Sequence, residues 1–329
     1  MKTSIFAERK IIEAIIGRLE KMPDMPVPFG DDVSAYLLKD GKLLVLKMDM
    51  LVDKTDVPKA MNIWQASRKA VVMNVSDFAA KGVEPRVILV SLGLPRKMAR
   101  RDIVEKVGEG LNAGAREYGA YIVGGDTSEA SDFIISISLF GTTKKNGLML
   151  RSGAMPGDII AVTGSFGKTA AGLKILLGGC QISSRIEKAL TESVLMPHAR
   201  LAEGLALRKT GAVTASIDSS DGLAWSLHEI ARASNVGFSI KYLPIADEVR
   251  DFAELNQLVA SDLALYGGEE YELVVTIKPG LWDEARKAVE KVNGQLLPIG
   301  EVVTGRKLVL ENGGRKCFIK PQGWEHFKN

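Results

Sequence analysis

The sequence has few residues of the types that form covalent cross-links or soft-metal sites. Among 329 residues there are 2 cysteines and 3 histidines, and they form no CxxC, HxH or HxxxH pattern. Neither a disulfide framework nor a zinc site is therefore indicated. Cys180 follows two glycines, where it is either a reactive thiol or, more commonly, a small apolar residue. No serine or cysteine is paired with a base, so no catalytic nucleophile is assigned.

Charge of one sign and long apolar runs are also missing. The 43 basic and 40 acidic residues nearly balance, and no run of five like charges occurs, so a nucleic-acid partner is not expected. No apolar stretch is long enough to span a membrane. Residues 1–20 have isoleucines at helical spacing, but Glu8, Arg9, Lys10 and Glu13 interrupt them. This pattern predicts an amphipathic helix rather than a signal peptide, and hence a cytoplasmic protein.

The composition that is present is typical of a folded protein with a packed core. Apolar residues make up 46% and charged residues 25% of the chain, and its length favours two domains. We expect two mixed α/β domains, residues 1–145 and 146–329, separated near the breaks at 144–147 and 154–157. Strands are expected at 33–38, 43–48, 86–92, 121–123, 133–140 and 158–163, and helices at 64–81 and 100–118. Asp40-Gly41 predicts a hairpin turn, and Gly82 a helix C-cap.

Six aspartates stand where ligand sites form in α/β proteins. Most of them flank predicted strands, and Asp77 lies inside a helix of small apolar residues. Carboxylates at strand ends gather on one rim of a sheet. Hard oxygen ligands without histidine or cysteine suit Mg²⁺, which usually accompanies phosphates. The six are Asp32, Asp49, Asp77, Asp126, Asp218 and Asp221.

Each aspartate taken alone has an ordinary explanation. Asp77 could pair with Lys81, one helical turn further on. Asp221 could cap the helix that begins near Gly222. Only the combination of six such positions favours a metal site.

Three glycine-containing loops are candidates for contact with phosphate. The segment 163–169 resembles a phosphate-binding loop, but Val162 stands where its first glycine would be, so a plain strand-to-helix turn is the better interpretation. The other two are Gly124-Gly125-Asp126 and Gly267-Gly268-Glu269. Paired glycines let a ligand approach the backbone closely, although each pair could also be an ordinary turn.

Six short motifs, in order, resemble those of one enzyme family. They are Gly30-Asp31-Asp32, Asn74-Val75-Ser76-Asp77, Gly124-Gly125-Asp126, Arg151-Ser152-Gly153-Ala154, Asp218-Ser219-Ser220-Asp221-Gly222-Leu223 and Gly267-Gly268-Glu269. With the segment 323–327 at the end, their order and spacing resemble the thiamine-monophosphate kinases, within the ATP-binding superfamily of aminoimidazole ribonucleotide synthetase. The resemblance covers nearly the whole chain.

The resemblance implies a homodimer. Residues 1–145 would form an α/β domain that binds ATP and Mg²⁺ and contributes its sheet to a barrel across the dimer. Residues 146–329 would form a second α/β domain that packs against the first and completes the nucleotide and substrate site. The implied reaction is direct in-line transfer of the γ-phosphate of ATP to thiamine monophosphate, assisted by several Mg²⁺ ions, which yields thiamine diphosphate.

The resemblance also implies roles for individual residues, by position. The six aspartates above would bind Mg²⁺. Contacts to ATP would come from Gly125, Asp126, Arg151 and Ser220, and contacts to the substrate from Asp56, Glu269 and Trp324. A tryptophan face suits a cationic thiazolium ring. Without the resemblance, Trp324 would be interpreted as a packing residue near the C-terminus.

Four positions depart from the family pattern. Lys47 and Met48 replace two hydroxyl residues before Asp49, and Lys47 shares a strand face with Asp49, where it could occupy the space of a metal ion. Asp56 replaces a substrate-contacting histidine, and Glu270 replaces an aspartate. Two other functions stay open: another enzyme of the superfamily, such as aminoimidazole ribonucleotide synthetase, or a nucleotide-binding relative that has lost catalysis.

Overall fold

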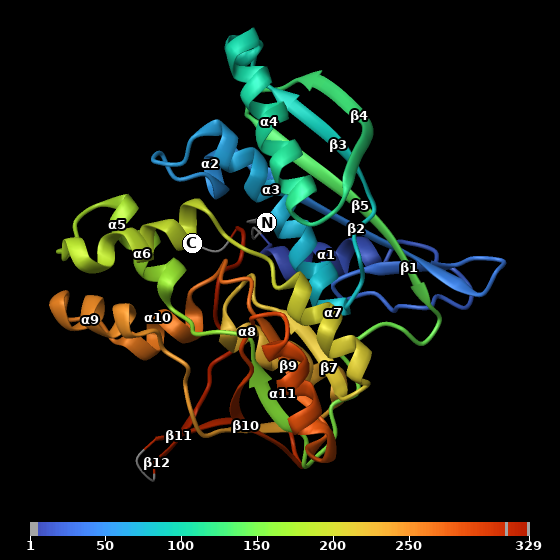
Figure 1. The fold of residues 1–329 in the computed structure, drawn as a ribbon, viewed down its shortest axis with the longest axis vertical. Helices are drawn as coiled ribbons and strands as arrows, with labels where there is room; N and C mark the ends of the chain where they lie inside the picture. Colours follow the sequence, from blue (N-terminus) through green and yellow to red (C-terminus); the bar gives the residue numbers. More distant parts are fainter. Residues whose placement is uncertain (1–5, 313–314, 328–329) are drawn as a thin grey trace, which may run out of the picture.

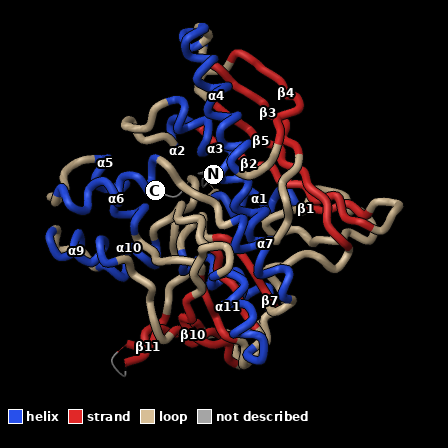
Figure 2. The backbone as a smooth tube through the Cα atoms, in the orientation of Figure 1, coloured by secondary structure: helices blue, strands red, loops and turns tan. Residues whose placement is uncertain are grey.

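Two β-sheets with helices packed around them form the protein, as Figures 1 and 2 show. The computed structural model describes residues 6–312 and 315–327. The first sheet has the strand order β1-β2-β5-β3-β4, in which only β3 and β4 run parallel. Its strands are β1 (Ser34–Leu37), β2 (Lys42–Val52), β3 (Val87–Leu94), β4 (Tyr121–Glu129) and β5 (Ile134–Lys144). A mixed α/β fold with two sheets confirms the predicted fold class.

The second sheet has the order β12-β11-β8-β10-β6-β9-β7. Its strands are β6 (Ile159–Val162), β7 (Val213–Asp218), β8 (Gly237–Ile240), β9 (Leu273–Ile277), β10 (Leu297–Val303), β11 (Leu308–Asn312) and β12 (Arg315–Phe318). The helices are α1 (Glu8–Ile16), α2 (Asp53–Asp56), α3 (Ile63–Lys81), α4 (Arg101–Glu117), α5 (Lys168–Leu177), α6 (Ser184–Leu195), α7 (Leu201–Thr210), α8 (Leu223–Ser234), α9 (Asp247–Leu255), α10 (Ala260–Tyr266) and α11 (Trp282–Glu290), with 3₁₀ turns at Arg96–Met98 and Pro279–Leu281. Among the described residues, no helix is long and apolar enough to cross a bilayer.

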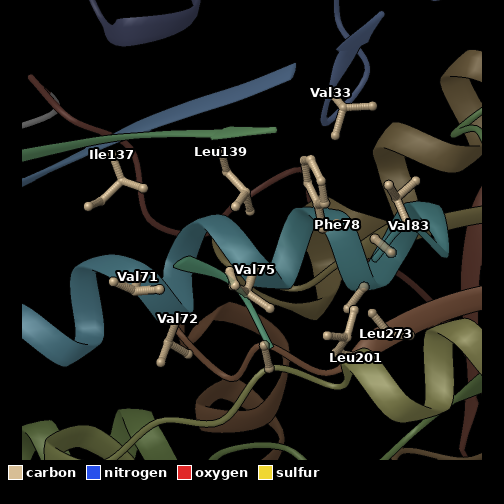
Figure 3. Packing of buried hydrophobic residues seen from close by; sticks show 14 of the residues in the cluster. Val33, Val71, Val72, Val75, Phe78, Val83, Ile137, Leu139, Leu201 and Leu273 are labelled. Carbon is tan, nitrogen blue, oxygen red and sulfur yellow. The ribbon is translucent and has the colours of Figure 1, made fainter. Parts of the chain in front are cut away.

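Helix α3 lies between the two sheets and positions much of the site. It contacts β2 and β5 of the first sheet and β7 and β9 of the second. In Figure 3, Ile137 and Leu139 of β5 lie on one side of this helix, and Leu201 and Leu273 lie on the other. As a result, 15 of its 19 residues are buried. Any charged side chain on α3 must therefore find a partner inside the protein.

Local signals at both ends of α3 explain its bounds. Asn62 and Gln65 form a capping box at the start, which satisfies two backbone N–H groups. Gly82 ends the helix with φ of +64°, a left-handed conformation that glycine adopts without steric cost. The hairpin predicted at Asp40-Gly41 is also present, since β1 and β2 pair antiparallel around a Gly41 with φ of +77°. These predictions from the sequence are confirmed.

Two strand predictions were wrong. In both cases a candidate ligand lies inside a strand rather than at its end. Strand β2 does not end at Met48 but continues to Val52, because it pairs with β5 along its whole length. Asp49 therefore lies inside the strand rather than at its end. Strand β4 is neither short nor buried: all nine of its residues are exposed, and Asp126 lies within it. It is an edge strand that pairs only with β3 among the described residues.

Candidate active site

Three aspartates from distant parts of the chain meet at the centre of the molecule. Asp32 precedes β1, Asp77 lies on α3 and Asp218 ends β7. One carboxylate oxygen from each lies within 4.8 Å of the other two, and all three residues are buried. Asp218 also accepts a 2.6 Å hydrogen bond from the Ser76 hydroxyl, one residue before Asp77 on α3. We call these three residues the aspartate cluster.

The other three predicted metal ligands lie outside this cluster. Asp49 is linked to it through Lys47, whose Nζ lies 2.8 Å from Asp77 Oδ2 and 4.0 Å from Asp49 Oδ2. Asp221 follows Asp218 by three residues and faces Arg9 at 3.9 Å. The predicted capping role of Asp221 is not seen: the N-cap position of α8 is Gly222, and no side-chain capping hydrogen bond is present there in the described structure. Asp126, on the exposed strand β4, is not brought to the cluster within this chain.

Two cations, Lys81 and Arg151, hold the Asp32 carboxylate. The Nζ of Lys81, a fully buried residue, lies 2.8 Å from Asp31 and 2.7 Å from Asp32, and it donates to the Ser216 carbonyl at 2.7 Å. Arg151 donates from Nε to Asp32 at 2.7 Å. The pair between Lys81 and Asp77 that the sequence allowed is therefore not formed. Arg151, predicted to contact ATP, is bound to Asp32.

The carboxyl groups of the cluster have unusual pKa values. Burial tends to raise the pKa of Asp32, but the charges of Lys81 and Arg151 outweigh it, so this pKa lies below its usual range. Burial raises the pKa of Asp77 well above its usual range, because the neighbouring carboxylates offset the charge of Lys47. Burial and the charge of Asp32 raise the pKa of Asp218 to about 6. With its acidic neighbours Asp31 and Asp49, the cluster brings together five carboxyl groups, which three cations contact: Lys47, Lys81 and Arg151.

This donor set fits a divalent cation such as Mg²⁺. The converging atoms are carboxylate oxygens, the ligands that Mg²⁺ prefers. A divalent ion would supply the missing positive charge and would lower the raised pKa values. Next to the cluster, the buried Ser219 hydroxyl has no hydrogen-bond partner among the described residues. Such an orphaned polar atom is consistent with a ligand at this place.

The segment from Ser219 to Asp221 ties the aspartate cluster to the predicted substrate residues. The backbone N–H of Glu269 donates to the Ser220 carbonyl at 2.6 Å, and that of Trp324 donates to the Asp221 carbonyl at 3.0 Å. The Tyr271 N–H donates to the Ser219 carbonyl at 3.0 Å. Three consecutive carbonyl groups beside the aspartate cluster therefore hold the two segments from which Glu269 and Trp324 project.

Close packing explains the paired glycines in this region. A Cβ on Gly268 would lie 2.6 Å from the Ser220 carbonyl oxygen, and one on Gly267 would lie 2.4 Å from the Ala170 side chain. In β4, a Cβ on Gly125 would lie 1.9 Å from the Val90 carbonyl oxygen. These contacts are too short for any side chain. Packing within the chain therefore requires glycine at positions 125, 267 and 268, whereas a Cβ on Gly124 would make only an ordinary contact with Leu89 at 3.5 Å.

A buried lysine that the sequence reasoning missed connects two predicted substrate residues. Lys69, on α3, is 1% exposed, and its Nζ lies 2.5 Å from Glu269 Oε1. The same ammonium donates to the Asp56 carbonyl at 2.8 Å. The Asp56 carboxylate itself accepts from the Val52 N–H at 2.7 Å. Glu269 adopts a left-handed φ of +63°, so its position depends on these surroundings.

Trp324 is not a buried packing residue. It is 51% exposed, and its ring meets that of His326 edge to face, with 5.8 Å between centroids. An exposed indole on a segment bound to the Asp221 carbonyl is suited to a planar cationic ring. Its backbone N–H also attaches the C-terminal segment to the Asp221 carbonyl, so Trp324 is half exposed at an anchored position.

The loop that resembles a phosphate-binding loop already holds an anion from the same chain. Backbone N–H groups of Gly167 and Thr169, at the start of α5, donate to the Glu270 carboxylate at 2.6 Å and 3.1 Å. Burial raises the pKa of Glu270 to about 7. A helix N-terminus favours a carboxylate, so this loop acts as an internal anchor for the segment that bears Glu269.

Comparison with known proteins identifies the family. Residues 30–143 match the family model "AIR synthase related protein, N-terminal domain", and residues 155–312 match "AIR synthase related protein, C-terminal domain". The chain is 36% identical to the thiamine-monophosphate kinase of Nitrosopumilus maritimus, over 91% of this chain and 93% of that protein. It is 39% identical to the thiamine-monophosphate kinase of Pyrococcus abyssi, over 90% of each.

A solved structure has the same fold over the full length. It is that of AaThiL complexed with AMPPCP and TMP, which superposes with a TM-score of 0.86 at 29% identity and covers 99% of this chain and 100% of that one. Identity above 30% to curated relatives over most of the chain, together with both matching domains, establishes the relationship. The chain belongs to the thiamine-monophosphate kinase family of the AIR synthase related proteins.

Proposed function

We propose that this protein transfers the γ-phosphoryl group of ATP to thiamine monophosphate. A phosphate oxygen of thiamine monophosphate forms a bond to the γ-phosphorus, and the bond from that phosphorus to the β,γ-bridging oxygen breaks. The products are thiamine diphosphate and ADP. The observation that carries the proposal is the buried aspartate cluster, which lies beside the Glu269 and Trp324 segments in a member of this kinase family.

We assign the metal site to the aspartate cluster, with Asp49 and Asp221 at its edges. Mg²⁺ bound there would neutralise charge on the triphosphate during in-line transfer. The protein's own groups fix the carboxylates: Ser76 orients Asp218, and Lys81 orients Asp32. Gly125, Asp126, Arg151 and Ser220 are the proposed ATP contacts, and Asp56, Glu269 and Trp324 are the proposed substrate contacts.

We further propose a homodimer formed through the first sheet. One face of this sheet packs on α3, while Met48 and Met50 of β2 and Val123 of β4 are exposed on the chain as described. The edge strand β4, which carries Asp126, also leaves one row of backbone groups without a strand partner among the described residues. A second copy would cover these apolar residues and pair this edge.

The direct test is turnover with a panel of phosphorylated metabolites, ATP and Mg²⁺. We expect thiamine diphosphate and ADP in equal amounts, measured by chromatography, and loss of both when EDTA removes the metal. Asp77→Asn should lose at least about a hundredfold in kcat, because the cluster loses one negative ligand. Asp40→Asn is the matched control, since Asp40 lies in an exposed hairpin turn.

Two outcomes would contradict this proposal. Tight ATP binding without any product would indicate a nucleotide-binding relative that has lost catalysis. Turnover of a different phosphorylated metabolite, with thiamine monophosphate untouched, would indicate another enzyme of the superfamily, such as aminoimidazole ribonucleotide synthetase.

A further inference from the structure

Lys47 places a positive charge inside the proposed metal site. It lies in the interior of β2, and its side chain is 18% exposed. Its Nζ lies 2.8 Å from Asp77 Oδ2 and 4.0 Å from Asp49 Oδ2. Strand alternation explains this position, because residues 47 and 49 project from the same face of β2 toward α3. The ammonium thus contacts one member of the aspartate cluster and faces a second proposed ligand.

The ion pair between Lys47 and Asp77 is largely shielded from solvent, since the two side chains are 18% and 10% exposed. The two other cations near the cluster, Lys81 and Arg151, bind Asp32 instead. Lys47 is therefore the cation that Asp77 contacts among the described residues.

An ammonium and a divalent ion compete for the same carboxylate. Both seek Asp77 Oδ2, and two cations a few ångströms apart repel each other strongly at a buried site. A metal ion at Asp77 must therefore displace Lys47 or bind in spite of it. With a neutral side chain at position 47, a metal ion would neither have to displace an ammonium group nor be repelled by one.

We propose that Lys47 is a resident cation of the aspartate cluster, which neutralises Asp77 when no nucleotide is bound and so weakens the binding of free divalent ions there. The proposal rests on the metal site assigned above, but not on the identity of the phosphoryl acceptor. It predicts that metal loads onto this protein together with the nucleotide, whose phosphates supply the extra negative charge that offsets the repulsion from Lys47.

The test is Mn²⁺ binding to the full chain without nucleotide, measured by calorimetry and by the electron paramagnetic resonance signal of free Mn²⁺. We expect Lys47→Met to bind Mn²⁺ at least about tenfold more tightly than the unaltered protein, or to bind one additional ion. Lys47→Arg keeps the charge and should behave like the unaltered protein. Lys42→Met is the matched control on the same strand, because Lys42 is exposed and pairs with Asp40.

A second readout is thermal unfolding with and without Mn²⁺. Lys47→Met leaves Asp77 without its cation, so its melting temperature should fall in metal-free buffer and rise with Mn²⁺ more than that of the unaltered protein. If Lys47→Met does not fold, the nearly isosteric Lys47→Gln replaces it in both measurements. Equal Mn²⁺ affinity, ion number and melting response in the folded variant and the unaltered protein would overturn the proposal.

These measurements also separate this proposal from the proposed function. Neither uses thiamine monophosphate or ATP. A protein that failed to make thiamine diphosphate would still show whether Lys47 competes with Mn²⁺ at Asp77.

Discussion

Three lysines bring charge into the interior of the protein, and each is paired with a different part of the site. Lys47 pairs with Asp77, Lys69 with Glu269, and Lys81 with Asp31 and Asp32. Lysine is almost never fully buried without a partner. These three ammonium groups therefore fix the carboxylates of the proposed metal site and of the proposed substrate site.

At the residue scale, Lys69 should act as a positioning residue for substrate. Lys69→Met removes the cation from Glu269 and the donor from the Asp56 carbonyl. We expect KM for thiamine monophosphate to rise by about tenfold or more, with a smaller change in KM for ATP. Steady-state kinetics with each substrate varied in turn measures this difference. Lys59→Met, at an exposed position, is the control.

The opposite pattern would contradict this role. If both KM values rose equally, or if only the melting temperature fell, Lys69 would be a structural residue alone. The ion pair is partly shielded from solvent, so part of the effect should persist at high salt.

The sequence predicted the carboxylates better than their partners. Each aspartate alone had an ordinary explanation, but the combination of six predicted a shared site, and three of the six meet in the structure. Strand alternation placed Lys47 beside Asp49, but Lys81 was given the wrong partner and Lys69 was not placed. A lysine in a sequence usually lies at the surface, and its long side chain can reach several elements. Only the burial pattern of α3 indicated that Lys69 and Lys81 lie inside, and their partners come from segments distant in the chain.

At the scale of elements, small residues set how closely other helices approach α3. A Cβ on Gly110 of α4 would lie 2.3 Å from the Trp64 carbonyl oxygen of α3. A Cβ on Gly204 of α7 would lie 2.0 Å from the Ala79 carbonyl oxygen, on the last turns of the same helix. Helix α3, which bears Asp77 and Lys69, is therefore held from two sides by backbone contact.

This packing predicts opposite effects for two glycines in one helix. Gly110→Ala forces α4 away from α3 and should lower the free energy of unfolding by about 1–3 kcal/mol. Gly108→Ala meets no atom within 4 Å and is exposed, so helix propensity should raise stability by up to about 1 kcal/mol. Urea unfolding of both variants gives the comparison. Equal shifts for the two would show that α4 does not depend on this contact.

Helix ends were predicted more accurately than strand ends, for a physical reason. The ends of α3 are determined by local groups, the Asn62–Gln65 capping box and Gly82. The ends of β2 and β4 depend on partner strands far away in the sequence. Pairing with β5 carries β2 past Asp49 to Val52, and pairing with β3 carries β4 through two glycines to Glu129.

At the scale of the whole molecule, the first sheet lacks cover on one side of the described chain. Met48 and Met50 are 66% and 51% exposed on β2, and Val123 is 59% exposed on β4. Asp126, a proposed ligand, projects from this same exposed strand rather than into the aspartate cluster. Contacts between chains cannot be derived from periodicity within one chain, and so the sequence predicted the dimer only through the family resemblance.

The proposed dimer can be broken at β4 without disturbing the site of a single chain. Val123→Glu places a charge on an apolar edge strand, and burial of an unpaired charge in an interface is costly. We expect this variant to sediment as a monomer at concentrations where the unaltered protein is a dimer. Leu177→Glu, at a 72% exposed apolar residue of α5, is the matched control and should remain dimeric.

A dimeric Val123→Glu protein, or an unaltered protein that is monomeric at every concentration, would contradict an interface through this sheet. If the dimer also serves catalysis through Asp126, the monomeric variant should lose turnover while its melting temperature changes little, because all residues of β4 are exposed in one chain.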